Sequence, residues 1–133
     1  MTSLGLVVAE FNAPVTEQME EAAREAAESA GADIVETVQV PGAYDSPLAA
    51  DRLARRDDVD AVAVLGSIIT GDTDHDQVIG HATAQKLTDV SLERDKPVTL
   101  GVTGPGMSAA EAYERVENAA SAVEGAVKLV ERL

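Results

Sequence analysis

The chain has 133 residues, no cysteine, and 24 acidic against 10 basic residues, which gives a formal net charge of −14. This length suits a single domain over residues 1–133 that buries a core without disulfides or metals. The missing thiols exclude cysteine catalysis and thiolate metal sites, and the lack of a basic patch disfavours nucleic acid as a partner.

The acidic residues are dispersed along the sequence, and only three of the ten basic residues are lysines. Two interpretations stay open: an acidic surface that meets a partner, or a solvated surface suited to very high salt, which we favour. At about 1 M salt the Debye length is about 3 Å, so repulsion within the chain would matter little. No segment has the pattern of a membrane span or a signal peptide, and we expect a cytoplasmic protein that binds no membrane.

Apolar and β-branched runs alternate with runs of helix-forming residues. Strands are predicted at 4–10, 33–40, 60–66 and 96–102, and helices at 15–31, 47–56, about 75–93 and from 108 to the end. Thr16 is expected to cap the first helix and Gly31 to follow its end. This pattern predicts the α/β class: a four-stranded parallel sheet with helices on both faces, a three-layer fold of the flavodoxin type.

Ligands bind such sheets beyond the carboxyl ends of the strands, which directs attention to the segments after residues 10, 40, 66 and 102. Two of the three aromatic residues, Phe11 and Tyr44, fall there. They would either plug the sheet edge or stack on a flat ligand, and their position favours neither alternative.

The segment GDTDHD at 71–76 places His75 among three aspartates. It lacks the glycine and glutamate positions of a calcium loop and any paired histidine, so we expect no metal site. Asp74 and Asp76 are interpreted as helix-start residues. His75 remains a candidate for proton transfer near neutral pH. Spacing alone favours a surface ion pair for Arg115.

Five segments, in matching order over nearly the whole chain, resemble the lumazine synthase family in its archaeal form. They are AEFN at 9–12, VPGAYDSP at 40–47, LGSIITGDTDHD at 65–76, KPVTLGVTGPGM at 96–107 and AEAYERVENAASAVEGAVKLVERL at 110–133. The resemblance implies a cofactor-free transferase of riboflavin biosynthesis. It would condense 5-amino-6-(D-ribitylamino)uracil with 3,4-dihydroxy-2-butanone 4-phosphate to 6,7-dimethyl-8-ribityllumazine, phosphate and water. It also implies sites between the subunits of a homopentamer or a multiple of pentamers.

By motif position, the resemblance also implies the site residues. Phe11 would stack on the pyrimidine, and the ribityl chain would be held by Ala43, Tyr44 and Asp45. The pyrimidine edge would meet backbone groups of Ser67, Ile68 and Ile69, with Leu100 as a pocket wall. Asp72 and Thr73 fall at the phosphate, His75 at the proton donor, and Arg115 at a phosphate-binding arginine that reaches a neighbouring subunit's site.

The chain departs from this pattern at three positions. Many family members have Arg at the position of Thr70, Ala or Gly at that of Asp72, and Phe at that of Leu100. Two other functions stay open: a riboflavin synthase of the archaeal type on the same fold, and a non-catalytic module that binds a flavin or pterin.

Overall fold

The computed structural model describes residues 1–133 and contains a parallel four-stranded sheet in the order β2-β1-β3-β4. The strands are β1 (Ser3–Ala9), β2 (Asp33–Val40), β3 (Ala61–Ile69) and β4 (Val98–Met107). The helices are α1 (Ala13–Ser29), α2 (Ser46–Ala54), α3 (His75–Arg94), α4 (Ala109–Glu114) and α5 (Asn118–Arg132), with a 3₁₀ turn, η1 (Ala43–Asp45). The predicted α/β fold is confirmed. None of the helices has the length and apolar character needed to cross a membrane.

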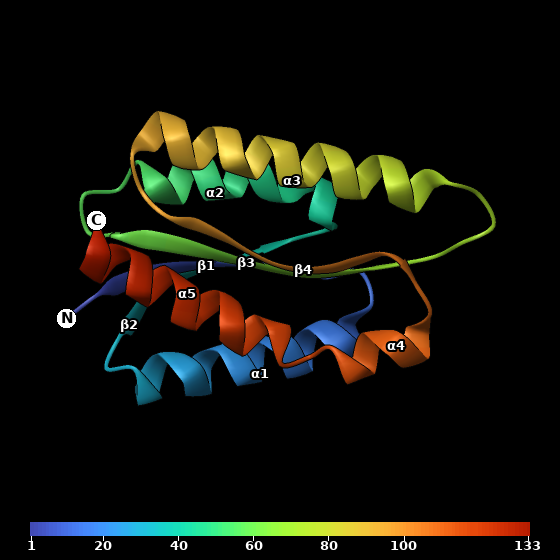
Figure 1. Ribbon diagram of the computed structural model, residues 1–133, viewed down its shortest axis with the longest axis horizontal. Helices are drawn as coiled ribbons and strands as arrows, with labels where there is room; N and C mark the ends of the chain where they lie inside the picture. The colour runs from blue at the N-terminus through green and yellow to red at the C-terminus, as the bar shows by residue number, and fades with distance from the viewer.

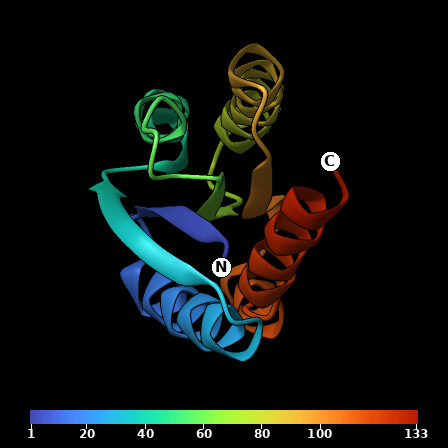
Figure 2. The ribbon, with the colours of Figure 1, turned by 90° about the vertical axis from the view of Figure 1, so that its left-hand side faces the viewer.

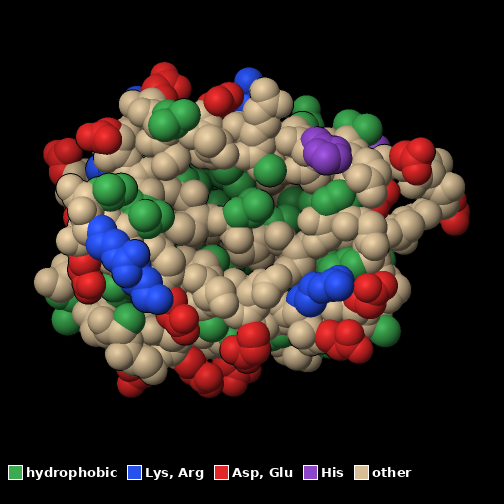
Figure 3. Space-filling model, viewed as in Figure 1, with side chains coloured by type: hydrophobic (Ala, Val, Ile, Leu, Met, Phe, Trp, Pro, Cys, Tyr) green, Lys and Arg blue, Asp and Glu red, His purple; other side chains and the backbone are tan.

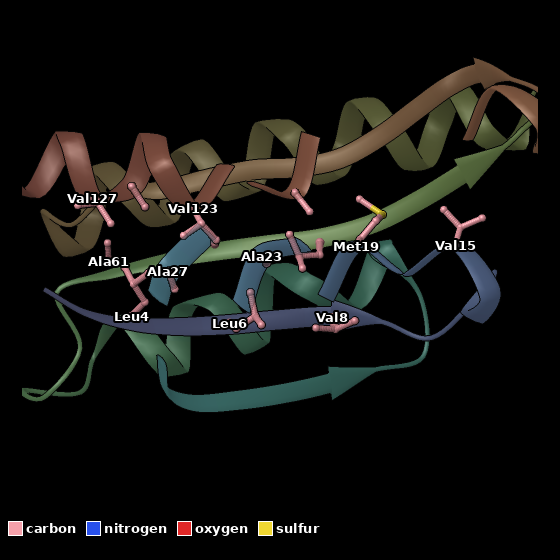
Figure 4. Close-up of a cluster of buried hydrophobic side chains, with 14 of the residues drawn as sticks. Leu4, Leu6, Val8, Val15, Met19, Ala23, Ala27, Ala61, Val123 and Val127 are labelled. Atoms are coloured by element: carbon pink, nitrogen blue, oxygen red, sulfur yellow. The ribbon is translucent and has the colours of Figure 1, made fainter. Parts of the chain in front are cut away.

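Two helical layers enclose the sheet, with α2 and α3 on one face and α1 and α5 on the other (Figure 1 and Figure 2). In β1, Leu4, Leu6 and Val8 pack toward α1 and α5, in the core that Figure 4 shows, whereas Val7 and Ala9 belong to the core under α2 and α3. The residues of β3 alternate in the same way. Because both central strands are covered on both faces, their sequences are almost continuously apolar.

The first helix begins earlier than predicted, and the capping role given to Thr16 is wrong. Asn12 precedes the helix in the left-handed conformation, with φ 65°, which Asn adopts more readily than most residues. Pro14 then presets the backbone of the first turn. Thr16 is buried within the helix, and its hydroxyl lies 3.5 Å from the carbonyl oxygen of Ala13. Gly31 does follow the helix end, with φ 70°.

Strands β3 and β4 both extend beyond their predicted ends. Ser67 pairs with Thr103 and Ile69 with Met107, so that residues 104–106 of β4 lie opposite Ile68 alone and form a bulge. Gly104, with φ +91°, fits because a Cβ there would collide with the carbonyl oxygen of Ile68. The segments SII at 67–69 and TGPG at 103–106, which lie beyond the predicted strands 60–66 and 96–102, are therefore strand ends.

The predicted final helix is two helices. A capping box starts α4, in which Ser108 Oγ accepts from the Glu111 N–H at 3.2 Å and Glu111 Oε1 from the Ser108 N–H at 3.1 Å. The chain turns at residues 115–117, before α5. No Gly or Pro marks this turn in the sequence. Ala112 and Ala119 are both fully buried in one core, and the turn keeps both there, so packing overrides helix propensity.

An ion pair joins α2 to α3, with Arg94 Nε 2.7 Å from Asp51 Oδ1. This hydrogen bond holds the pKa of the Asp51 carboxyl below its ordinary value of 3.8. Because the folded state favours the ionised carboxylate, the stabilisation is present above the ordinary pKa and is lost as the pH falls through the lowered pKa.

We expect Asp51→Asn to lower the denaturation midpoint at neutral pH, and the difference from the wild type to shrink as the pH falls below about 3.8. Urea unfolding across this pH range measures it. Asp57→Asn is the control, because Asp57 is exposed and makes no side-chain bond. A difference between Asp51→Asn and the wild type that stayed constant down to the lowest pH would contradict the assignment.

Candidate functional site

A pocket of about 480 Å³ opens at the carboxyl ends of β1 and β3. The connections run outward in opposite directions from these two neighbouring strands, which makes their junction the switch point where ligands bind in such sheets. The pocket is of the size that takes a small organic molecule.

Nine of the twelve predicted site residues line this pocket: Phe11, Ala43, Tyr44, Asp45, Ser67, Ile68, Ile69, Thr73 and His75. Leu100, Asp72 and Arg115 do not. Sequence reasoning missed seven further lining residues: Ala9, Asn12, Gly42, Gly71, Asp76, Val78 and Ile79. Helical spacing could have revealed two of them, because residues three and four positions after His75 share its face of α3.

Two aromatic side chains stand at the pocket, with Phe11 67% and Tyr44 66% exposed. The Phe11 N–H donates to the carbonyl of Pro41 at 2.9 Å, which ties the end of β1 to the segment after β2. A Cβ on Gly42 would lie 2.7 Å from Cδ2 and 2.8 Å from Cε2 of Phe11. Gly42 therefore sets how closely the Phe11 ring packs on the backbone. Exposed aromatic rings at a pocket are available to stack on a ligand.

Polar side chains hold the pocket segments together. Asp45 Oδ2 accepts from the Gly42 N–H at 3.0 Å, so one carboxylate oxygen is engaged within η1. Ser46 Oγ donates to the Ala43 carbonyl at 2.7 Å. Asn12 Nδ2 donates to the Ser67 carbonyl at 2.8 Å and bridges the ends of β1 and β3. These bonds make the pocket a largely preformed site.

His75 is the first residue of α3 and lies at the end of an exposed segment. Its backbone N–H donates to Thr73 Oγ1 at 3.3 Å. The prediction that Asp74 and Asp76 are helix-start residues is confirmed, since Asp74 is the N-cap residue of α3 and Asp76 lies in its first turn, but neither side chain caps the helix. Asp74 occupies the cap position without a side-chain hydrogen bond, and Asp76 Oδ2 accepts from the Gly106 N–H, at the end of β4. No group of three or more His, Asp or Glu side chains is arranged to hold a metal ion.

The lining of the pocket contains no Lys or Arg, although it contains Asp45 and Asp76. Arg115 ends α4 outside the pocket and is about half exposed. Its Nη1 lies 3.4 Å from Met107 Sδ and its Nη2 3.5 Å from Glu111 Oε2, so the predicted surface ion pair is present but long. This pocket alone therefore has no fixed positive charge for an anion.

Only some residues of the segment 70–74 line the pocket. Gly71 and Thr73 line the pocket, whereas Asp72 between them is exposed and does not. Leu100 lies in β4 with 53% of its surface exposed, also away from the pocket. The three predicted residues outside the lining are thus all accessible on the surface of the chain.

Comparison with known proteins supports one assignment. The family model described as 6,7-dimethyl-8-ribityllumazine synthase matches residues 2–133. A protein of that name from Halobacterium salinarum is 74% identical over 133 residues, with all of both chains covered. Relatives of the same name are 70% identical in Halorubrum lacusprofundi, covering 100% of this chain and 99% of the relative, and 59% identical in Methanosarcina barkeri, covering 98% of each. The chain therefore belongs to the 6,7-dimethyl-8-ribityllumazine synthase family.

Proposed function

We propose that this chain condenses 5-amino-6-(D-ribitylamino)uracil with 3,4-dihydroxy-2-butanone 4-phosphate to give 6,7-dimethyl-8-ribityllumazine. One observation carries the proposal: a single pocket at the switch point combines Phe11 and Tyr44 with His75. A flat ring needs stacking surfaces, and a condensation with elimination needs a group that moves protons.

The reaction needs no cofactor. The 5-amino group attacks the ketone, water leaves, and an imine forms. Phosphate is then eliminated, and the second amino nitrogen attacks the remaining carbonyl carbon and closes the ring with loss of a second water. Binding both substrates in one pocket supplies proximity and orientation, and His75 transfers protons to and from the reacting atoms.

The pyrimidine and its ribityl chain would occupy the side of the pocket formed by β1, η1 and β3. Phe11 stacks on the ring, and backbone groups of residues 67–69 bind its edge. Ala43 and Tyr44 hold the ribityl chain. Asp45 contributes the carboxylate oxygen that the bond to Gly42 leaves free, and this oxygen accepts from ribityl hydroxyls.

The phosphate would lie near the exposed segment before α3. Thr73 and the backbone around Asp72 bind it, and the position of Asp72 outside the lining supports a carboxylate that turns away from the phosphate. With no cation in the pocket, the countercharge would come from Arg115 of a neighbouring subunit.

The need for Arg115 from a neighbouring subunit also supports a homopentamer, or a multiple of pentamers, with sites between subunits. The outer edge of β4 is unpaired, and Figure 3 shows hydrophobic side chains along the hollow between α3 and α5, over β4. An apolar surface of this kind is typical of an interface. Leu100, exposed on β4, would then form a wall of a site that the neighbour completes.

The direct test incubates the purified protein with both substrates in molar salt and follows lumazine absorbance and released phosphate. Formation of both products in equal amounts supports the proposal. Absence of both would reject it, and conversion of lumazine alone to riboflavin would identify the related synthase instead.

We expect Gly42→Ala to raise the KM for the pyrimidine substrate by about tenfold, because the new methyl group displaces the Phe11 ring. Steady-state kinetics with the phosphate substrate saturating measures this change. Gly125→Ala in α5 is the matched control, since its Cβ would meet nothing within 4 Å. Equal KM values for the two variants would refute the role of Gly42.

We further propose that the net charge of −14 suits the chain to high salt, as the relatives from Halobacterium and Halorubrum suggest. Assemblies should dissociate on desalting, because the Debye length grows from about 3 Å at 1 M to about 30 Å at 0.01 M salt. Sedimentation velocity across this range measures the effect, with sucrose as a control for osmotic changes. An unchanged sedimentation coefficient would contradict it.

A further inference from the structure

The segment that carries His75 has few attachments to the rest of the molecule. All six residues from Thr70 to His75 are exposed, and Figure 1 shows the chain between β3 and α3 projecting beyond the end of the sheet. Asp76, at 7% exposure, is the first buried residue that follows. The position of His75 therefore depends on what holds Asp76.

Both hydrogen bonds of the Asp76 side chain use one carboxylate oxygen. Oδ2 accepts from the Gly106 N–H at 3.0 Å and from the Thr70 hydroxyl at 3.4 Å. Thr70 is itself held by its N–H, which donates to the Met107 carbonyl at 2.9 Å. One carboxylate thus connects the start of α3, the end of β3 and the end of β4.

The bulge in β4 explains why this carboxylate is needed. Residues 104–106 lie opposite Ile68 alone, so the ladder between β3 and β4 is interrupted there. The Gly106 N–H takes Asp76 as its acceptor in place of a strand partner. A second contact fixes the same bulge to α3, because a Cβ on Gly80 would lie 2.6 Å from Cδ of Pro105.

We infer that Asp76 is a positioning residue: its carboxylate fastens α3 to the β4 bulge and so places His75 at the pocket. This inference rests on the proposed function only for the role of His75. The role of Asp76 is geometric, so the length of its side chain matters more than its charge. An error in position of about 1 Å can cost about a hundredfold in rate when reacting groups must be aligned.

Two conservative variants separate length from charge. Asp76→Asn removes the charge but keeps an oxygen that can accept from the Gly106 N–H, and we expect its kcat to stay within about threefold of the wild type. Asp76→Glu keeps the charge but moves the carboxylate, and we expect its kcat to fall about tenfold or more with little change in KM. Asp74→Asn removes a charge from the same turn at a residue without a side-chain bond, and should leave kcat unchanged.

A second readout does not depend on activity. The chain has two histidines, so the NMR signals of the His75 ring can be compared with those of the exposed His81 on the same helix. We expect Asp76→Glu to shift the His75 signals and to leave those of His81 in place. Should this variant fail to assemble, Asp76→Ser, whose side chain is too short to reach Gly106, replaces it with the same expectation.

The outcomes distinguish the two proposals. A wild-type protein that makes no lumazine refutes the proposed function, while the His75 signals still test Asp76. A lower kcat in Asp76→Asn than in Asp76→Glu would show that charge is what matters and would overturn the inference. Unmoved His75 signals in Asp76→Glu would overturn it as well.

Discussion

Arg115→Ala is expected to raise the KM for the phosphate-bearing substrate by about 10- to 100-fold, since a hydrogen bond to a charged group is worth about 1.5–3 kcal/mol. The pocket lining has no Lys or Arg, so a dianionic substrate would lose its main countercharge. The KM for the pyrimidine, which carries no phosphate, should change little. Steady-state kinetics with each substrate varied in turn measures both values.

Two further variants sharpen this prediction. Arg115→Lys keeps the charge but loses the planar, two-pronged geometry of the guanidinium, and should give an intermediate KM. Arg132→Ala removes an exposed arginine near the end of α5 and is the matched control for the change in net charge. If the KM for the phosphate substrate is the same in Arg115→Ala and Arg132→Ala, Arg115 does not bind phosphate.

The parts of the fold that the sequence predicted are those in which local pattern and burial agree. The central strands β1 and β3 are apolar because helices cover both of their faces, and the same burial makes them recognisable. The break between α4 and α5 could not be predicted, because nothing local marks it. It arises where Ala112 and Ala119 must share one core.

The residues of the candidate site likewise divide into those that could be predicted from the sequence and those that could not. Side chains such as Phe11, Tyr44 and His75 could be selected because they lie in the segments that connect strand ends to the following helices, where parallel sheets bind ligands. Asp76 was predicted correctly as a helix-start residue, but its hydrogen bond to Gly106 was not predicted, because Gly106 is 30 residues away in the sequence. Periodicity and capping rules describe neighbours along one element, whereas a bond between α3 and a bulge in β4 depends on the folded topology.

A mixing experiment tests whether one site draws on two subunits. His75→Ala is expected to lower kcat by about 100-fold, at the lower end of the range for acid–base catalysis because both substrates remain held together. Arg115→Ala impairs phosphate binding instead. When the two variants are dissociated in low salt and reassembled together, a subunit with an intact His75 can meet a neighbour with an intact Arg115.

In a random equal mixture, about one site in four would combine the intact residues of two neighbours, so activity should rise well above that of either variant alone. Each variant dissociated and reassembled by itself is the control. A double variant mixed equally with the wild type adds a second comparison. Sites within one subunit would leave about half of them intact, whereas sites between subunits would leave about a quarter. No recovery in the first mixture, together with half activity in the second, would place Arg115 and His75 in the same subunit's site. That result would require Arg115, which lies outside the pocket here, to move into it when substrate binds.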